Sequence, residues 1–246
     1  MKILSWNILA NEFISKRYYP MLPTDILFKR SARLQQIISL LSREDLDVLL
    51  LQEVMLSEYN ALDTFFARHY HLIKSKSIVW QGVRSHSMNV ILLKKNMFTL
   101  RRGAGITFFN FGVMVECWLK YGLNHYVPIL ISNVHLDDLS KAVRLKQLEE
   151  LESQLTSVDN VIIGGDFNEN YSKTSPLYNR VKSFGLKIMN EEPTYYIGRK
   201  MCIDNIMLKG SSNKVKVKVI NDYDNNVLEH FINYGSDHLP VIVITR

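Results

Sequence analysis

Short apolar runs recur along the chain and predict a series of β-strands. They cover Lys2–Trp6, Asp47–Leu51, Asn89–Leu93, Val127–Val134, Asn160–Ile163, Ile203–Leu208, Lys214–Ile220 and Val241–Ile244. Most are continuously apolar, which is typical of strands that are buried on both faces. Residues 214–220 instead alternate lysine and valine. We interpret them as an edge strand protected by its lysines, with a phosphate-binding ridge as the alternative.

Two segments have the helical period instead. In each, apolar side chains recur every three or four residues: Leu34, Ile37, Ile38 and Leu41 in the first, and Ala142, Leu145, Leu148, Leu151 and Leu155 in the second. A doubly wound sheet would need a helix after nearly every strand. So many strands with few helices between them predict a mixed α/β protein of two packed sheets with helices outside.

Composition limits the class of protein further. The chain has 246 residues, 47% of them hydrophobic, and no linker or internal repeat divides it, so we expect a single domain over residues 1–246. Cys117 and Cys202 form no spacing motif, which favours a reduced, intracellular protein, cytoplasmic or nuclear. The start MKILSWNILANEF is not typical of a signal peptide, and no apolar run approaches the roughly 18 residues of a membrane span. We expect no membrane partner.

The charge is modestly basic. A net charge of +6 and a pI of about 9.2 favour phosphate-rich partners such as nucleic acid, although a surface rich in ordinary lysines gives the same numbers. Charge alone therefore leaves the partner open.

Polar side chains of a few types stand where the predicted strands end, which is where α/β folds build sites. They are Asn7, Glu53, His135, Asp166, Asn168, Asp237 and His238, with Asp204 at the start of another strand. Taken singly, each has a structural explanation, such as a turn or a buried histidine. Their concentration at so many strand ends favours one functional site.

The residue types indicate the chemistry. Carboxylates and amide oxygens without cysteine suit Mg²⁺ or Mn²⁺ rather than zinc. Mg²⁺ typically takes one or two carboxylates, waters and a substrate phosphate, which leaves other acids free for proton transfer. His135 and His238 have ordinary pKa values near neutrality, and Asp204 or Asp237 could orient a histidine. Asp166 and Asn168 are two apart, so in extended chain they would share one face.

Together, these segments resemble a known family. SWNIL (residues 5–9), LQEV (51–54), NVHL (133–136), GDFN (165–168), IDNI (203–206) and GSDHLP (235–240) are similar, in this order, to motifs of the endonuclease/exonuclease/phosphatase superfamily, which includes pancreatic DNase and exonuclease III-like enzymes. The resemblance implies a four-layer α/β sandwich, with two packed mixed β-sheets flanked by helices. It also implies metal-dependent hydrolysis of phosphodiesters.

The resemblance also implies roles for the matching residues. His238, paired with Asp204, looks like the catalytic histidine that closes the site. Glu53 resembles the principal Mg²⁺ ligand, with Asn7 beside it and Asp237 as a further or supporting ligand. Asp166 and Asn168 resemble the pair that positions water and phosphate. His135 resembles a second histidine that the exonuclease III-like branch replaces by asparagine, which argues against an abasic-site endonuclease.

One branch is the most similar. Tyr18-Tyr19-Pro20, Pro23 and Arg30 or Arg33 between Asn7 and Glu53 resemble the nocturnin, angel and carbon-catabolite-repressor type deadenylases. This implies a 3′-to-5′ exoribonuclease that acts on single-stranded RNA. Where those enzymes stack an aromatic ring on adenine, this chain has Arg199, and the nearby Tyr195 and Tyr196 could take that place.

Other functions stay open. The segment from His135 to Asp138, with Arg144 and Gln147, also resembles the 5′-tyrosyl-DNA phosphodiesterases, and a DNA nuclease or a small-molecule phosphatase could use the same residues. A non-catalytic binding module is least favoured because every expected catalytic position is present. Beside the tyrosines and Arg199, we expect Arg144 and Asn89 to contact substrate.

Overall fold

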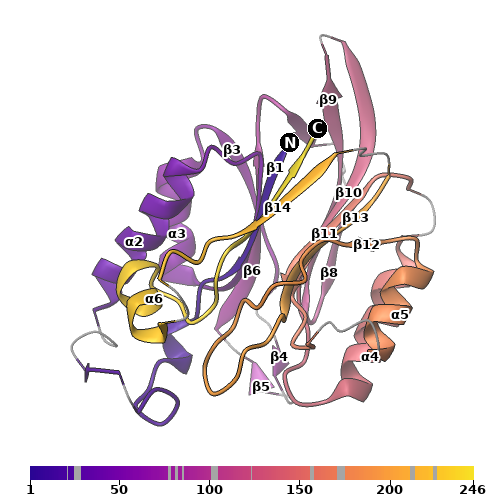
Figure 1. Ribbon diagram of the computed structural model, residues 1–246. Helices are drawn as coiled ribbons and strands as arrows, with labels where there is room; N and C mark the ends of the chain where they lie inside the picture. Colours follow the sequence, from indigo (N-terminus) through magenta and orange to yellow (C-terminus); the bar gives the residue numbers. More distant parts are fainter. Residues whose placement is uncertain are drawn as a thin grey trace.

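Two β-sheets pack face to face in the computed structural model, and helices cover both outer faces, which gives four layers (Figure 1). This confirms the predicted four-layer α/β sandwich. The structure describes residues 1–20, 22–24, 29–76, 79–80, 83–84, 86–100, 105–122, 124–155, 158–170, 175–210, 214–223 and 226–246.

The first sheet is mixed. Its strands are, in order, β14 (Val215–Val219), β15 (Val241–Thr245), β1 (Lys2–Asn7), β2 (Val48–Met55), β6 (Ser87–Lys94) and β3 (Tyr70–Lys74). β1 lies in the middle, parallel to β2 and antiparallel to β15. β14 lies at the edge of this sheet, as its alternating lysines predicted.

The second sheet faces the first. Its order is β12 (Lys187–Ile188), β13 (Asp204–Lys209), β11 (Val161–Asp166), β10 (His125–His135), β9 (Gly112–Tyr121) and β7 (Phe98–Leu100), and β8 (Ile106–Phe109) also pairs with β9. β10 and β11 are parallel, so both end on the same edge of the sheet. A separate hairpin is formed by β4 (Val79–Trp80) and β5 (Val83–Arg84).

The helices are divided between the two outer faces. α2 (Arg30–Arg43), α3 (Leu56–Phe66) and α6 (Val227–Asn233) lie on the side of the first sheet, and α4 (Lys141–Ser153) and α5 (Pro176–Ser183) cover the second (Figure 1). A short 3₁₀ helix, η1 (Asn11–Phe13), follows β1. The two segments with helical period correspond to α2 and α4. None of the helices in the described parts of the chain is long and apolar enough to cross a membrane.

Apolar side chains fill all three interfaces between the layers. Along β1, Leu4 packs toward the helices while Ile3 packs toward the second sheet, in the same cluster of buried side chains as Ile131. Burial on both faces explains why these strands are continuously apolar in sequence.

A buried polar bridge joins the two sheets close to their functional end. The Nε2 atom of Gln52 donates to Oδ1 of Asn133 at 2.7 Å, and Nδ2 of Asn133 donates to the carbonyl of Leu51. Asn89 Nδ2 in turn donates to the Asn133 carbonyl at 3.3 Å, and this side chain is fully buried. Asn89 therefore helps to hold the sheets together, and its predicted contact with substrate stays a prediction.

Candidate active site

A bulge in β2 turns Glu53 into the site. The pairing of β2 with β6 shifts between Leu51 and Val54, and Glu53 has a φ of 59°, which is uncommon for a residue with a side chain. Its Oε2 atom accepts from the backbone N–H of Ala10 at 2.8 Å. Burial raises the pKa of Glu53 above its ordinary value, and the nearby His135 imidazole partly offsets this by lowering it. The carboxylate is thus fixed by hydrogen bonds at a buried position, where its negative charge is costly unless a cation lies close by.

Asn7 connects two carboxylates at the end of β1. Its Nδ2 atom donates to Oε1 of Glu53 at 2.8 Å and to Oδ2 of Asp166 at 3.1 Å. Its Oδ1 atom accepts from the backbone N–H of Leu9. The amide nitrogen, not the oxygen, therefore faces the site, which is the opposite of the orientation predicted for a metal ligand. In this arrangement Asn7 positions the carboxylates.

The segment from Asp166 to Asn168 is a turn. Asn168 has a φ of 49°, and its backbone N–H donates to Oδ1 of Asp166 at 2.9 Å. Asn168 Nδ2 donates to the Leu136 carbonyl. The expectation of extended chain is therefore wrong here, and the turn brings both side chains to the site instead. Gly165 is needed before it, because a Cβ there would lie 1.9 Å from the Val134 carbonyl oxygen.

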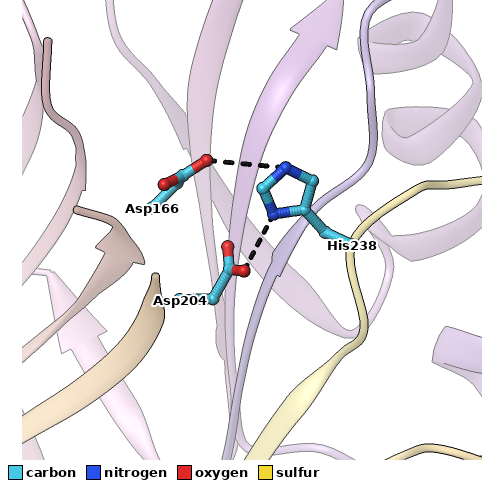
Figure 2. Close-up of side chains that lie close together, drawn as sticks. All are labelled: Asp166, Asp204 and His238. Carbon is cyan, nitrogen blue, oxygen red and sulfur yellow. Dashed lines mark hydrogen bonds and ion pairs between the residues drawn. The ribbon is translucent and has the colours of Figure 1, made fainter. Parts of the chain in front are cut away.

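His238 and Asp204 form the predicted pair. Figure 2 shows the imidazole of His238 between Asp204 and Asp166. Its Nδ1 atom lies 2.8 Å from Oδ2 of Asp204, and its Nε2 atom lies 3.7 Å from Oδ2 of Asp166. Burial alone would lower the pKa of His238, but the surrounding carboxylates, Asp204 foremost, raise it well above its ordinary value. This histidine is therefore a cation at neutral pH.

The loop that carries His238 is fastened to β1. Trp6 Nε1 donates to the His238 carbonyl at 2.9 Å, and Ser236 Oγ donates to the Asn7 carbonyl at 2.7 Å. Gly235 has a φ of 79°, and a Cβ there would lie 2.5 Å from the side chain of Arg33. The loop of residues 235–240, which precedes β15, is therefore held against the end of β1. This contact places Asp237 and His238 at the site.

His135 lies at the end of β10, beside the carboxylates. Its Nε2 atom is 3.5 Å from Oδ2 of Asp166 and 4.0 Å from Oε1 of Glu53. Burial lowers the pKa of His135, although Glu53 opposes this effect. The surroundings therefore favour the protonated form of His238 and the neutral form of His135.

Two supporting contacts were not predicted. The Tyr19 hydroxyl donates to Oδ2 of Asp237 at 2.9 Å, and burial raises the pKa of this phenol, so it stays protonated. Arg33 is buried, donates to the carbonyls of Ile8 and Gly235, and forms an ion pair with Glu58. Both residues lie in the stretch that resembles the deadenylases, which was the available signal. The side chain of Arg30, the other arginine considered there, lies outside the described residues.

These side chains open on a pocket of about 430 Å³. Its polar lining residues are Glu53, His135, Asp138, Asp166, Asn168, Asp237 and His238. The other lining residues are largely apolar or aromatic: Leu9, Phe13, Tyr18, Tyr19, Tyr195, Met201 and Ile203. A charged group and an aromatic ring system could therefore bind side by side in it.

The predicted substrate contacts divide into two groups. Tyr195 lines the pocket with its ring centroid 5.0 Å from that of His238, and Arg199 is exposed nearby. Tyr196 points away from the pocket and packs edge-on against His230. Arg144 is buried and bonded to Glu169 and to the carbonyls of residues 137 and 138. Arg144 therefore supports a loop, and its predicted substrate contact stays a prediction.

The donor set fits a divalent cation. Burial, together with the nearby Asp204, raises the pKa of Asp166 to about 7. Oδ1 of Asp237 and Oδ1 of Asp204 have no hydrogen-bond partner among the described residues. Asp166, Asp204 and His238 also present ligand atoms within 4.8 Å of one another, but the 2.8 Å bond between His238 and Asp204 is that of an acid–histidine pair. Glu53 and Asp237 are therefore the better candidates for ligands, since hard oxygen donors suit Mg²⁺.

Sequence comparison places the chain in a family. Residues 4–238 match the Endonuclease/Exonuclease/phosphatase family, so the chain belongs to it. It is accordingly a hydrolase of phosphate esters that depends on a divalent metal. A sequence search of curated proteins found no match.

Solved structures share the fold. ANGEL2, described as a 2′,3′-cyclic phosphatase in complex with adenosine-2′,3′-vanadate, has a TM-score of 0.77 at 18% identity, over 98% of this chain and 94% of that one. TDP2 of D. rerio with a single-strand DNA product has a TM-score of 0.67 at 15% identity, over 100% and 98%. The catalytic domain of human nocturnin with bound sulfate has a TM-score of 0.67 at 17% identity, over 100% and 93%.

Proposed function

We propose that the protein hydrolyses phosphodiester bonds in single-stranded nucleic acid with Mg²⁺ as cofactor, and that its substrate is RNA, shortened from the 3′ end as in the deadenylases. The observation that carries this proposal is the convergence of the His238–Asp204 pair, His135, Asp166 and Glu53 on one pocket that aromatic rings also line. Phosphate suits the charged residues of this pocket, and a base suits its aromatic rings.

The carboxylates and Asn168 would prepare the attacking water. Glu53 and Asp237 would hold Mg²⁺, which supplies Lewis-acid polarisation of the phosphate when bound. Asp166, whose pKa of about 7 suits a base at neutral pH, accepts a proton from water. Asn168 lies in the same turn and orients that water or a phosphoryl oxygen.

The histidines would stabilise the charge that develops on phosphorus. His238 is cationic and is oriented by Asp204, so its Nε2–H can donate to a phosphoryl oxygen. His135 lies on the other side of Asp166 and adds a neutral donor. Water attacks phosphorus directly, the bond from phosphorus to the leaving oxygen breaks, and that oxygen takes up a proton from solvent; no covalent enzyme intermediate forms.

Two other phosphodiesters are second candidates. The likeness to ANGEL2 over nearly the whole of both chains favours a terminal 2′,3′-cyclic phosphate, which the same direct attack of water would open. The likeness to TDP2, together with the segment from His135 to Asp138, favours a 5′-tyrosyl-DNA end. Both chemistries use the same catalytic residues.

The test is a cleavage panel with Mg²⁺ or with EDTA. The substrates are end-labelled oligo(A), mixed-sequence RNA, single-stranded DNA, RNA with a 2′,3′-cyclic phosphate end, and 5′-phosphotyrosyl DNA. Each is treated with the wild type, with Glu53→Gln, and with the matched exposed variant Glu149→Gln. We expect a Mg²⁺-dependent ladder that shortens RNA from its 3′ end, absent in Glu53→Gln and retained in Glu149→Gln.

Other outcomes assign the other substrates. Opening of the cyclic end alone, or release of tyrosine alone, replaces the exoribonuclease by that activity. No cleavage in any arm, with folded protein and Mg²⁺ present, contradicts a nucleic-acid substrate and favours a small phosphate ester.

A further inference from the structure

A second hollow is lined in part by the chain that directly follows Glu53. Its walls are the β2–α3 junction (Met55, Leu56 and Ser57), the end of β3 and the residues after it (Lys74, Ser75 and Lys76), and the start of β6 (His86 and Met88). We call this hollow the lysine groove. Its volume of about 660 Å³ exceeds the 430 Å³ of the active-site pocket. There is therefore space beside the pocket for more than one nucleotide's backbone.

Two short connections link the groove to the pocket. Met55 follows Glu53 by two residues, so their Cα atoms are at most about 7 Å apart. In addition, the backbone N–H of His86 donates to Oε2 of Glu12 at 3.4 Å, and Phe13, the neighbour of Glu12, lines the pocket. A strand whose phosphate lies at Glu53 can therefore continue directly into the groove.

The side chains of the groove suit a single strand. Lys74 Nζ lies 4.4 Å from the ring centroid of Tyr59, and Lys76 Nζ lies 5.6 Å from that of Phe108. Neither lysine forms an ion pair with an acid in the part of the chain that the structure describes. Phe108, on β8 of the second sheet, is 45% exposed. Exposed cations beside an exposed ring are the elements with which proteins bind single-stranded nucleic acid.

We infer that the lysine groove binds the phosphates of nucleotides next to the scissile bond, and that Phe108 stacks on one of their bases. This inference rests on the proposed function, because it extends the same substrate beyond the pocket. In this arrangement Lys74 and Lys76 neutralise two phosphates. Because a mononucleotide would fill only the pocket and leave the groove empty, the groove would favour binding of a polymer.

The experiment compares two matched double variants. Lys74→Gln/Lys76→Gln removes the charges of the groove, and Lys216→Gln/Lys218→Gln removes two similarly spaced lysines from the edge strand β14. Affinity for a fluorescent dodecanucleotide, as RNA and as DNA, is measured by anisotropy in EDTA at several salt concentrations. Each phosphate contact of a single strand contributes about 0.7 to the slope of log K against log[salt], so the groove variant should lose roughly 1.4 of that slope.

A loss of roughly 1.4 in slope corresponds to roughly 25-fold weaker binding by the groove variant at about 0.1 M salt. The β14 variant should bind like the wild type. Phe108→Leu should weaken binding without a change in the salt slope, because it removes stacking and no charge. Loss of affinity for RNA or for DNA in the groove variants alone supports the inference, and the sugar that binds more tightly identifies the substrate class. Equal losses in both lysine variants would show diffuse binding to a basic surface and overturn it.

Cleavage separates this inference from the proposed function. In the groove variant, the ratio of kcat/KM for a dodecanucleotide to that for a dinucleotide should fall toward one. An unchanged ratio together with unchanged affinity overturns the groove and leaves the proposed activity standing. If the wild type cleaves neither substrate, the proposed function fails, and the anisotropy experiment still decides whether the groove binds nucleic acid.

Discussion

His238 and His230 lie on one short segment of the chain, and both are buried, with 6% and 1% of their surfaces exposed. His238 contacts the Asp204 carboxylate, and its pKa is raised. His230 lies 3.2 Å from the amide oxygen of Asn221 and packs against the ring of Tyr196, and burial lowers its pKa. Burial is therefore not what separates them.

The neighbours of each imidazole decide its charge. Desolvation disfavours the cation at both positions, and only carboxylates close by reverse that effect. The site at the sheet ends thus gains a cationic histidine, while the region of α6 gains a neutral one that serves packing. Matched substitutions at His238 and at His230, or beside them, should therefore differ in their effects on activity and stability.

The largest difference should be in catalysis. His238→Gln removes the cation that stabilises the developing phosphate charge and should lower kcat by about 10³-fold or more. His230→Gln, which changes the same type of side chain outside the pocket, should leave kcat within a few-fold. Rates on an oligonucleotide, with circular dichroism to confirm folding, measure both. Similar rates for the two variants would remove His238 from the mechanism.

The carboxylate beside His238 should come next. Asp204→Asn keeps the size of the side chain and removes the charge that favours the imidazolium, so kcat should fall by about 10²-fold. The pH profile should also change, because the pKa of His238 falls toward its ordinary value. Asn221→Asp makes the reverse change beside His230 and should leave the rate unaltered. A pH profile of Asp204→Asn identical to that of the wild type would contradict this role.

Metal binding should stabilise only the acidic region. At tenfold its Kd, Mg²⁺ should add about 1.4 kcal/mol to the free energy of unfolding and raise Tm by roughly 3–6 °C. Glu53→Gln should lose this increase, and His230→Gln should keep it. Differential scanning fluorimetry with Mg²⁺ and with EDTA measures the shift. The same shift in Glu53→Gln would place the metal elsewhere.

The pH dependence of stability should have opposite signs at the two histidines. His238, with its pKa raised, contributes stability that is fully present below about pH 6.5 and lost as pH rises through its folded pKa. His230, with its pKa lowered, contributes stability that is present above about pH 6.5 and lost as pH falls through its folded pKa.

Urea unfolding in EDTA can separate these effects. As pH falls from about 6.5 to 5, the free energy of unfolding should decrease less in His230→Gln than in the wild type. As pH falls from about 8.5 to 6.5, it should increase less in His238→Gln than in the wild type. Parallel curves for the wild type and both variants would show that neither histidine titrates differently on folding.

The smallest effect should concern the aromatic neighbours. Tyr195 packs against His238 at the pocket, and Tyr196 packs against His230. An aromatic contact contributes about 1 kcal/mol, so Tyr195→Leu should lower kcat/KM by about fivefold. Tyr196→Leu should lower Tm and leave kcat/KM unchanged. Equal losses of kcat/KM would mean that neither ring contacts substrate specifically.

Much of the fold could be predicted because its strands are buried on both faces. Continuous apolar runs located the strands at the centre of each sheet, and their polar ends located the site. β9 was not predicted, since Glu116 interrupts its apolar pattern. α3 was also missed, although Tyr59, Leu62 and Phe66 have helical spacing.

The details of the site were harder because they depend on distant contacts. The orientation of Asn7 is set by Leu9, Glu53 and Asp166 together. The Tyr19–Asp237 bond joins residues 218 apart in sequence. Local pattern gives the identity of a site residue, but which of its atoms faces inward is decided by partners elsewhere in the chain.

The hydrogen bond from Trp6 to His238 closes a loop of 232 residues, one of the longest-range contacts in the molecule. Chain closure over such a distance carries a high entropic cost and slows folding. The loop that carries His238 is fastened to β1 only when that closure is made. Recovery of activity during refolding should therefore lag behind the recovery of helical signal, because helical hydrogen bonds join residues that are close in sequence.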